Sequence, residues 1–152
     1  MRRLAFPLSA MTLGALLQAI VASPAANAAN ASAHMFDLHA GEELAIPISI
    51  VDGRVTTGAP RASKLGAGEP RDGEILVGLE HEPGTLYNHI KVVEKTAQPI
   101  DFLVTGLNGG TKIDETEICG RLDAPVAARI GSIPWRFWLN GFEVGKGGTG
   151  CP

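Results

Sequence analysis

The sequence "ELAIPISIVDGRVTT", residues 43–57, decides the fold class of this chain. Its apolar side chains recur at every second position, which is the period of a half-buried β-strand. These side chains are Leu44, Ile46, Ile48 and Ile50. Asp-Gly at 52–53 predicts a two-residue turn, and the resulting hairpin would pair Ile50 with Val55. Because Pro47 has no backbone N–H to donate, we expect this strand at the edge of a sheet or beginning near Pro47.

The same alternation continues through the middle of the chain. It predicts strands in "EILVGLEHE" (74–82), "LYNHIKVVEKT" (86–96) and "PIDFLVTGL" (99–107). Their expected inward side chains are Ile75, Val77 and Leu79, then Ile90 and Val92, then Ile100, Phe102 and Val104. "NGG" at 108–110 predicts a hairpin into "TKIDETEICGRL" (111–122), whose polar character indicates a solvated face or an edge position.

Near the C-terminus, "IPWRFWLNGFEVGK" (133–146) carries Asn140-Gly141 between two apolar runs. This dipeptide predicts another tight hairpin. In that register Leu139 would face Phe142, and Phe137 would face Val144, on a core side. Trp138, Arg136 and Glu143 would then lie together on the opposite, mixed face.

These elements predict an all-β fold, a small antiparallel β-sandwich or barrel of seven or eight short strands. Residues 58–73 are rich in Gly and Pro and have no apolar period, so they are expected to form a long, mobile surface loop. The one stretch with some helical character is "APVAARI" at 124–130. Residues 34–152 are therefore expected to form a single β-rich domain.

Residues 1–33 have the organisation of a secretory signal peptide. Arg2 and Arg3 precede the apolar run 8–22, and small residues permit cleavage after Ala28, Ala31 or Ala33. A transmembrane anchor is the alternative, but the run is short of the ~20 residues that a bilayer requires. We therefore expect a periplasmic or secreted protein that does not span the membrane once the signal is removed.

Charge and cysteine content narrow the class of function. The formal net charge is −3, and the sequence has no cluster of Lys and Arg, which argues against nucleic-acid binding. In an oxidising compartment Cys119 and Cys151 are expected to form a disulfide. Such a bond would contribute roughly 3–4 kcal/mol in the chain-entropy model. A redox or metal-binding pair is a weaker alternative, because the two cysteines lack C-x-x-C spacing. A free Cys151 is the other alternative.

A copper site is one hypothesis for a cofactor. Cleavage after Ala33 would make His34 the first residue, whose α-amine and ring nitrogen could chelate copper. His39, His81 and His89 are candidate further ligands, and Met35 could assist as a soft ligand. Otherwise these histidines are ordinary surface residues, and no cofactor is expected.

Catalytic patterns are weak. Glu115 and Glu117 would share a strand face at about 7 Å, a separation compatible with glycoside hydrolysis. A solvated edge strand explains the two carboxylates equally well. Ser132 lies outside any G-x-S-x-G motif. A small secreted hydrolase is therefore the least favoured of the functional hypotheses.

The favoured hypothesis is an exported, non-catalytic binding domain of the cell envelope or extracellular space. Trp138, flanked by Arg136 and Glu143, could stack on a sugar ring or anchor a protein contact. The alternative is that Trp138 packs against a second sheet or beneath residues 58–73. A copper-binding periplasmic β-sandwich with His34 at its terminus is the second hypothesis.

Overall fold

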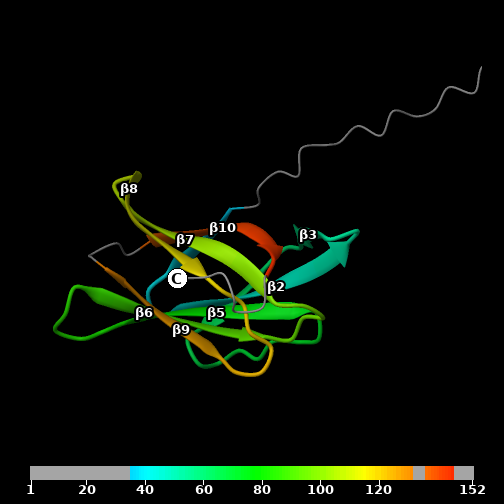
Figure 1. The fold of residues 1–152 in the computed structure, drawn as a ribbon. Coiled ribbons are helices and arrows are strands. Elements are labelled where there is room, and N and C mark those ends of the chain that lie inside the picture. Colours follow the sequence, from blue (N-terminus) through cyan, green and yellow to red (C-terminus); the bar gives the residue numbers. More distant parts are fainter. Residues whose placement is uncertain (1–34, 132–135, 146–152) are drawn as a thin grey trace, which may run out of the picture.

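The computed structural model describes residues 35–131 and 136–145, and within them every regular element is a β-strand. Two antiparallel sheets lie in two layers (Figure 1). The four-stranded sheet has the order β1-β10-β7-β8 and the larger sheet the order β3-β2-β5-β6-β9, with β4 also paired to β2. The strands are β1 (Phe36–His39), β2 (Glu42–Val51), β3 (Arg54–Thr57), β4 (Arg61–Lys64), β5 (Glu74–His81), β6 (Tyr87–Glu94), β7 (Ile100–Asn108), β8 (Thr111–Ile118), β9 (Val126–Gly131) and β10 (Arg136–Val144). The predicted all-β fold is confirmed.

A continuous apolar core separates the two sheets. All eight side chains that alternation placed inward on β5, β6 and β7 belong to it, together with Leu38, Phe137 and Leu139 of the four-stranded sheet. At one side of the sandwich β8 approaches β9, where the Gly131 N–H donates to Asp114 Oδ2 at 2.9 Å. At the other side β10 approaches β3. The sheets therefore curl toward one another around the core.

The hairpin between β2 and β3 forms as predicted. Ile50 is paired with Val55, and the turn residues Asp52 and Gly53 both have positive φ, at 50° and 73°. Positive φ at both central residues is typical of a type I′ turn, whose twist matches that of the two flanking strands. The inward set on β2 is likewise confirmed, because Leu44, Ile46 and Ile48 are buried and Ile50 packs against them.

The edge position expected from Pro47 is wrong. Strand β2 is flanked on one side by β5 and on the other by two short partners, β4 along 42–45 and β3 along 48–51. Pro47 lies where one partner ends and the other has not begun, so its missing N–H interrupts no ladder there. Its carbonyl oxygen still accepts the Gly58 N–H at 2.9 Å.

Residues 58–73 contain a strand, which corrects the expectation of a continuous loop. Strand β4 pairs with β2, and the buried carboxylate of Glu43 binds the segment that follows. Glu43 accepts hydrogen bonds from Ser63 Oγ (2.9 Å), the Gly66 N–H (2.9 Å) and the Gly68 N–H. A carboxylate that collects several donors in this way compensates for its own burial.

A second carboxylate, Glu74, binds the two ends of the same segment. It accepts a hydrogen bond from the Arg71 N–H at 2.9 Å and another from Arg61 at 2.7 Å. These two bonds, the first of them the stronger influence, lower the pKa of Glu74. The segment is thus bonded to the six-stranded sheet, where Leu65 lies against Gly78.

The predicted hairpin at Asn140-Gly141 is also wrong. Strand β10 continues through this dipeptide, and its register against β7 shifts between Asn140 and Glu143. Gly141 has φ 67°, and the two residues Gly141 and Phe142 oppose the single residue Phe102. This is a β-bulge with glycine in the left-handed position. The bulge turns Phe142 toward the core, where it stacks on Phe102 at 5.2 Å between ring centroids.

Two further segments differ from the sequence-based expectation. Residues 126–131, which overlap the weak helical candidate 124–130, form strand β9 along β6. Residues 36–39, which were not assigned, form strand β1 along β10. In both segments backbone pairing with a long neighbouring strand prevails over local preference, which is weak in a stretch this short.

The predicted edge position of the polar strand is confirmed, because β8 ends the four-stranded sheet. Cys119 follows β8 directly and is half-buried. Cys151 and the signal segment 1–33 lie outside the described residues, so the disulfide and the cleavage site stay predictions. Within the described ranges, no helix has the length and apolar character that crossing a bilayer would require.

Candidate functional site

Trp138 lies on the outer face of the four-stranded sheet, by which we mean the side directed away from the core. Its neighbours Phe137 and Leu139 are fully buried in the core, so alternation directs the Trp138 side chain outward. The ring is half-buried there, and Trp138 is paired with Asp37 on β1 and with Thr105 on β7. Packing against the second sheet, or beneath residues 58–73 on that other sheet, is therefore wrong.

An oriented ion pair borders the indole. Arg136 donates two hydrogen bonds to Asp37, one to each carboxylate oxygen, both at 2.8 Å. The Arg136 guanidinium carbon is 6.0 Å from the centre of the Trp138 ring. The hydrogen bond from Arg136 is the main cause of a lowered pKa of Asp37. Two parallel bonds fix the planes of both groups, which a single contact would not do.

A second chain of polar groups crosses the same face. Asn140 Nδ2 donates to Thr105 Oγ1 at 3.4 Å, and Thr105 Oγ1 donates to Glu115 Oε2 at 3.0 Å. Lys112 Nζ lies 2.8 Å from the other oxygen of Glu115. These contacts, chiefly the one with Lys112, lower the pKa of Glu115. Side chains of β10, β7 and β8 are thereby held in a fixed arrangement beside Trp138.

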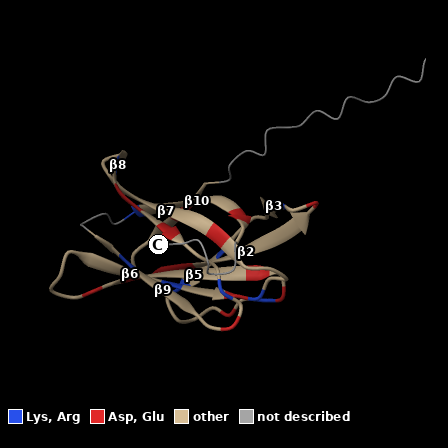
Figure 2. Ribbon diagram, in the orientation of Figure 1, with Lys and Arg blue, Asp and Glu red and all other residues tan. Residues whose placement is uncertain are grey.

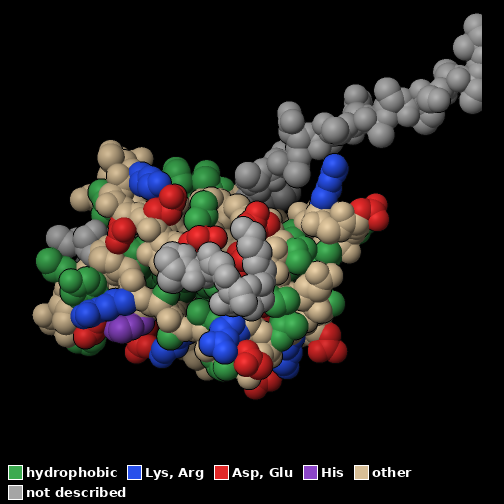
Figure 3. Space-filling model, viewed as in Figure 1, with side chains coloured by type: hydrophobic (Ala, Val, Ile, Leu, Met, Phe, Trp, Pro, Cys, Tyr) green, Lys and Arg blue, Asp and Glu red, His purple; other side chains and the backbone are tan. Residues whose placement is uncertain are grey.

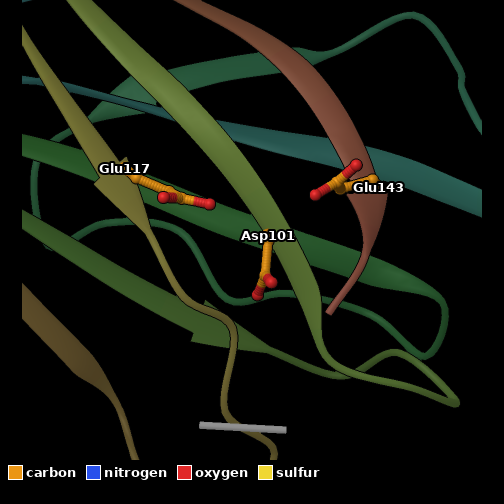
Figure 4. Close-up of side chains that lie close together, drawn as sticks. All are labelled: Asp101, Glu117 and Glu143. Carbon is orange, nitrogen blue, oxygen red and sulfur yellow. The ribbon is translucent and has the colours of Figure 1, made fainter. Parts of the chain in front are cut away.

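Three carboxylates converge at one end of the outer face. Asp101, Glu117 and Glu143 come from β7, β8 and β10, and Figure 4 shows Glu117 and Glu143 pointing toward each other with the Asp101 carboxylate beside them. Each can present one oxygen so that all three oxygens lie within 4.8 Å of one another. Figure 2 shows acidic positions on neighbouring stretches of these strands, and Figure 3 shows acidic side chains gathered on the surface over them.

Local backbone features bring these carboxylates together. The bulge at Gly141 places Glu143 opposite Asp101, where an uninterrupted register would not. The Gly120 N–H donates to Asp101 Oδ1 at 3.0 Å, and Gly145 packs so closely that a side chain there would collide with Asp101. Oxygen donors of this kind suit hard cations such as Ca²⁺ rather than copper.

Among the described residues, the candidate copper ligands His39, His81 and His89 do not form one group. His39, at the end of β1, lies 3.3 Å from Glu42, whereas His81 ends β5 in the other sheet and contacts Asn88 at 3.3 Å. His89 contacts Glu82 at 3.0 Å. His34 lies outside the described residues, so the copper hypothesis stays a prediction. In the part of the chain that the structure describes, the carboxylates Asp101, Glu117 and Glu143 are the group of three or more that could hold a metal.

All three residues predicted for the binding face, Trp138, Arg136 and Glu143, lie on the outer face, but Glu143 is opposite Asp101 at one end of it and not beside Trp138, which is opposite Thr105. The sequence-based prediction put Glu143 beside Trp138 because it assumed a hairpin at Asn140-Gly141. It omitted Asp101 and Thr105, which are buried polar residues on the outer side of β7. A usable signal was present, because Asp101 lies between the inward Ile100 and Phe102 and Thr105 directly follows the inward Val104, so both have the outward parity. It also omitted Asp37, since β1 was not assigned.

A separate ionic cluster lies on the outer side of the six-stranded sheet. Glu82 binds both His89 and Arg129, at 3.0 and 2.9 Å, and the Arg129 guanidinium lies 3.7 Å above the Tyr87 ring. Each charged group in this cluster therefore has a partner within it. We regard it as a structural feature of the strand ends rather than as a ligand site.

Comparison of the chain with protein-family models, with characterised proteins and with solved structures found no significant match. The assignment of the candidate site therefore rests on the geometry described above.

Proposed function

We propose that this protein is an exported, non-catalytic binding domain that holds a glycan against the outer face of its four-stranded sheet. The observation that carries the proposal is the outward position of Trp138 beside the oriented Asp37–Arg136 pair. An indole offers a flat apolar surface to the C–H groups of a sugar ring. Carboxylate, guanidinium and amide groups at its rim can bind the hydroxyls of the sugar.

A glycan suits this face better than a protein partner does. The centre of a protein interface is depleted in charged residues and contains several apolar anchors. The outer face instead combines a half-buried indole and the half-buried Leu103 with four polar or charged residues, Asp37, Arg136, Asn140 and Glu115, each of which is hydrogen-bonded. Polar groups that are already ordered lose little conformational entropy when a polyhydroxylated ligand replaces bound water.

The experiment is isothermal titration calorimetry of the exported protein. The ligands are soluble cello-, chito- and malto-hexaoses and solubilised peptidoglycan fragments. We expect one class to bind, and Trp138→Ala to weaken that binding about 30-fold, which corresponds to a hot-spot loss of about 2 kcal/mol. Tyr87→Ala is the matched control, because Tyr87 is an exposed aromatic residue of the other sheet.

Thermal unfolding of Trp138→Ala separates a binding role from a packing role. A midpoint close to that of the unmodified protein, together with weakened binding, supports the proposal. A large fall of the midpoint with unchanged affinity overturns it. Binding of an envelope protein, but of none of these glycans, at the Trp138 face would replace the glycan by a protein partner.

A further inference from the structure

Glu94 is a carboxyl group at the end of the core that the proposed binding face does not use. It ends β6 on the inward side, two residues after the buried Val92, and it is 8% exposed. Glu94 Oε2 accepts the Ile100 N–H at 3.3 Å, whereas Glu94 Oε1 has no hydrogen-bond partner among the residues that the structure describes. A buried carboxylate oxygen without a donor disfavours the ionised form.

The contacts of Glu94 join two other segments of the chain. A side chain at Gly120 would collide with Glu94 Oε1 and with the backbone of Ile100, so these three residues are in close contact. Gly120 also donates its N–H to Asp101 Oδ1 on the outer side of β7. A shift of Gly120 away from Glu94 would therefore also alter the bond that positions Asp101 in the carboxylate group of the outer face.

The surroundings of Glu94 favour its neutral form. Burial, followed in smaller measure by repulsion from Asp101, raises the pKa of Glu94 to about 7 against the opposing effect of the Ile100 N–H. On the neighbouring β5, Glu74 is bound to Arg61 and to the Arg71 N–H. In the segment after β8, Arg121 lies 3.4 Å from Asp123. Lys95, the next residue of the chain, has an exposed side chain.

We propose that Glu94 makes this end of the sandwich sensitive to pH, and that it couples the state of the core to the Asp101 end of the outer face. When Glu94 is neutral, Ile100 and Gly120 pack against it. When it is ionised, the unpartnered oxygen requires water, and the contact among Glu94, Ile100 and Gly120 opens locally. The Gly120–Asp101 hydrogen bond is lost in the opened state.

The test is amide hydrogen exchange of the full exported chain at pH 5.5 and pH 8.5, corrected for the intrinsic dependence of exchange on pH. A change of pKa from 4.5 to about 7 corresponds to an opening equilibrium about 30-fold more favourable at pH 8.5. We expect the protection of Ile100 and Gly120 to fall by this factor. Val77, in the centre of the core, exchanges only through global unfolding and should therefore stay better protected than Ile100 and Gly120 at both pH values.

Glu94→Gln should make the protection of both amides independent of pH, and Glu69→Gln, at an exposed position, should leave the fall intact. Equal protection at the two pH values in the unmodified protein would overturn the proposal, and so would an unchanged fall in Glu94→Gln. If Glu94→Gln does not fold, carboxyl carbon NMR of the unmodified protein decides. A midpoint near 7 for Glu94 supports the proposal, and one near 4.5 refutes it.

Discussion

Glu43 and Glu94 are both buried carboxylates of the six-stranded sheet, and their surroundings are opposite. Glu43, on the outer side, collects three donors from residues 63–68 and uses both of its oxygens. Glu94, on the inner side, has one long hydrogen bond and one oxygen without a donor. Burial alone therefore does not decide what an acid does in this fold. The supply of donors decides whether the carboxylate stabilises a segment or makes it sensitive to pH.

Glu43→Ala should show the largest effect, a loss of about 4 kcal/mol in the free energy of unfolding. It removes three hydrogen bonds to a charged acceptor, from Ser63, Gly66 and Gly68, which contribute about 1.5 kcal/mol each at the lower end of the range for charged groups. Urea unfolding measures the loss, and trypsin should then cleave after Lys64 or Arg71. Glu42→Ala, at the exposed neighbouring position, is the control. A loss below about 1 kcal/mol would contradict the role assigned to Glu43.

Gly120→Ala should destabilise the fold by about 3 kcal/mol, the upper part of the range for overpacking. The added methyl group would collide with backbone atoms of Ile100, which belong to a paired strand and cannot move independently. Urea unfolding at pH 5.5 measures the effect while Glu94 is neutral. An unchanged free energy of unfolding in Gly120→Ala would show that the Glu94 end of the core is loosely packed.

Glu94→Gln should raise the free energy of unfolding by about 2 kcal/mol at pH 8.5 and change that free energy little at pH 4.5. The folded state holds the proton of Glu94 up to about pH 7, while the unfolded chain releases it near 4.5. Stability of the unmodified protein therefore falls as pH rises between these values and stays low above them. Urea unfolding across this range, with Glu69→Gln as the control, measures the difference. A parallel pH profile in Glu94→Gln would be inconsistent with the raised pKa.

Gly68→Ala should give the smallest effect, about 1 kcal/mol, although its methyl group would also meet crowded atoms. These are the ends of the Glu43 and Ser63 side chains, which can rotate away, whereas the neighbours of Gly120 are backbone. Urea unfolding of Gly68→Ala and Gly120→Ala side by side tests this distinction. Equal losses would mean that Glu43 is held as rigidly as a strand.

The sequence predicted the inward faces of the long strands well, because period-two alternation reports burial directly. It predicted the turn at Asp52-Gly53 correctly but not the bulge at Asn140-Gly141. Asp52 and Gly53 both adopt positive φ and form a turn, whereas at 140–141 only Gly141 does, and the chain continues as a bulge. Both dipeptides permit left-handed backbone. The stacking of Phe142 on Phe102, a contact remote in sequence, favours the bulge.

The binding face was predicted in part for a related reason. Trp138 and Arg136 are two residues apart on one strand, so local alternation places them together whether or not a hairpin follows. Asp37 is 99 residues from Arg136, and only the pairing of β1 with β10 brings them into contact. The partners of Glu43 and Glu94 likewise depend on side-chain geometry, which leaves no periodic signal in the sequence.

The polar edge strand β8 has a consequence for how copies of this protein behave at high concentration. Within the described residues β8 forms a ladder with β7 alone, so its other side could template a strand from another molecule. Lys112, Asp114, Glu115 and Glu117 place charges along it, and charges of this kind oppose intermolecular strand addition. Replacing these charged side chains by neutral ones should therefore promote aggregation through this edge.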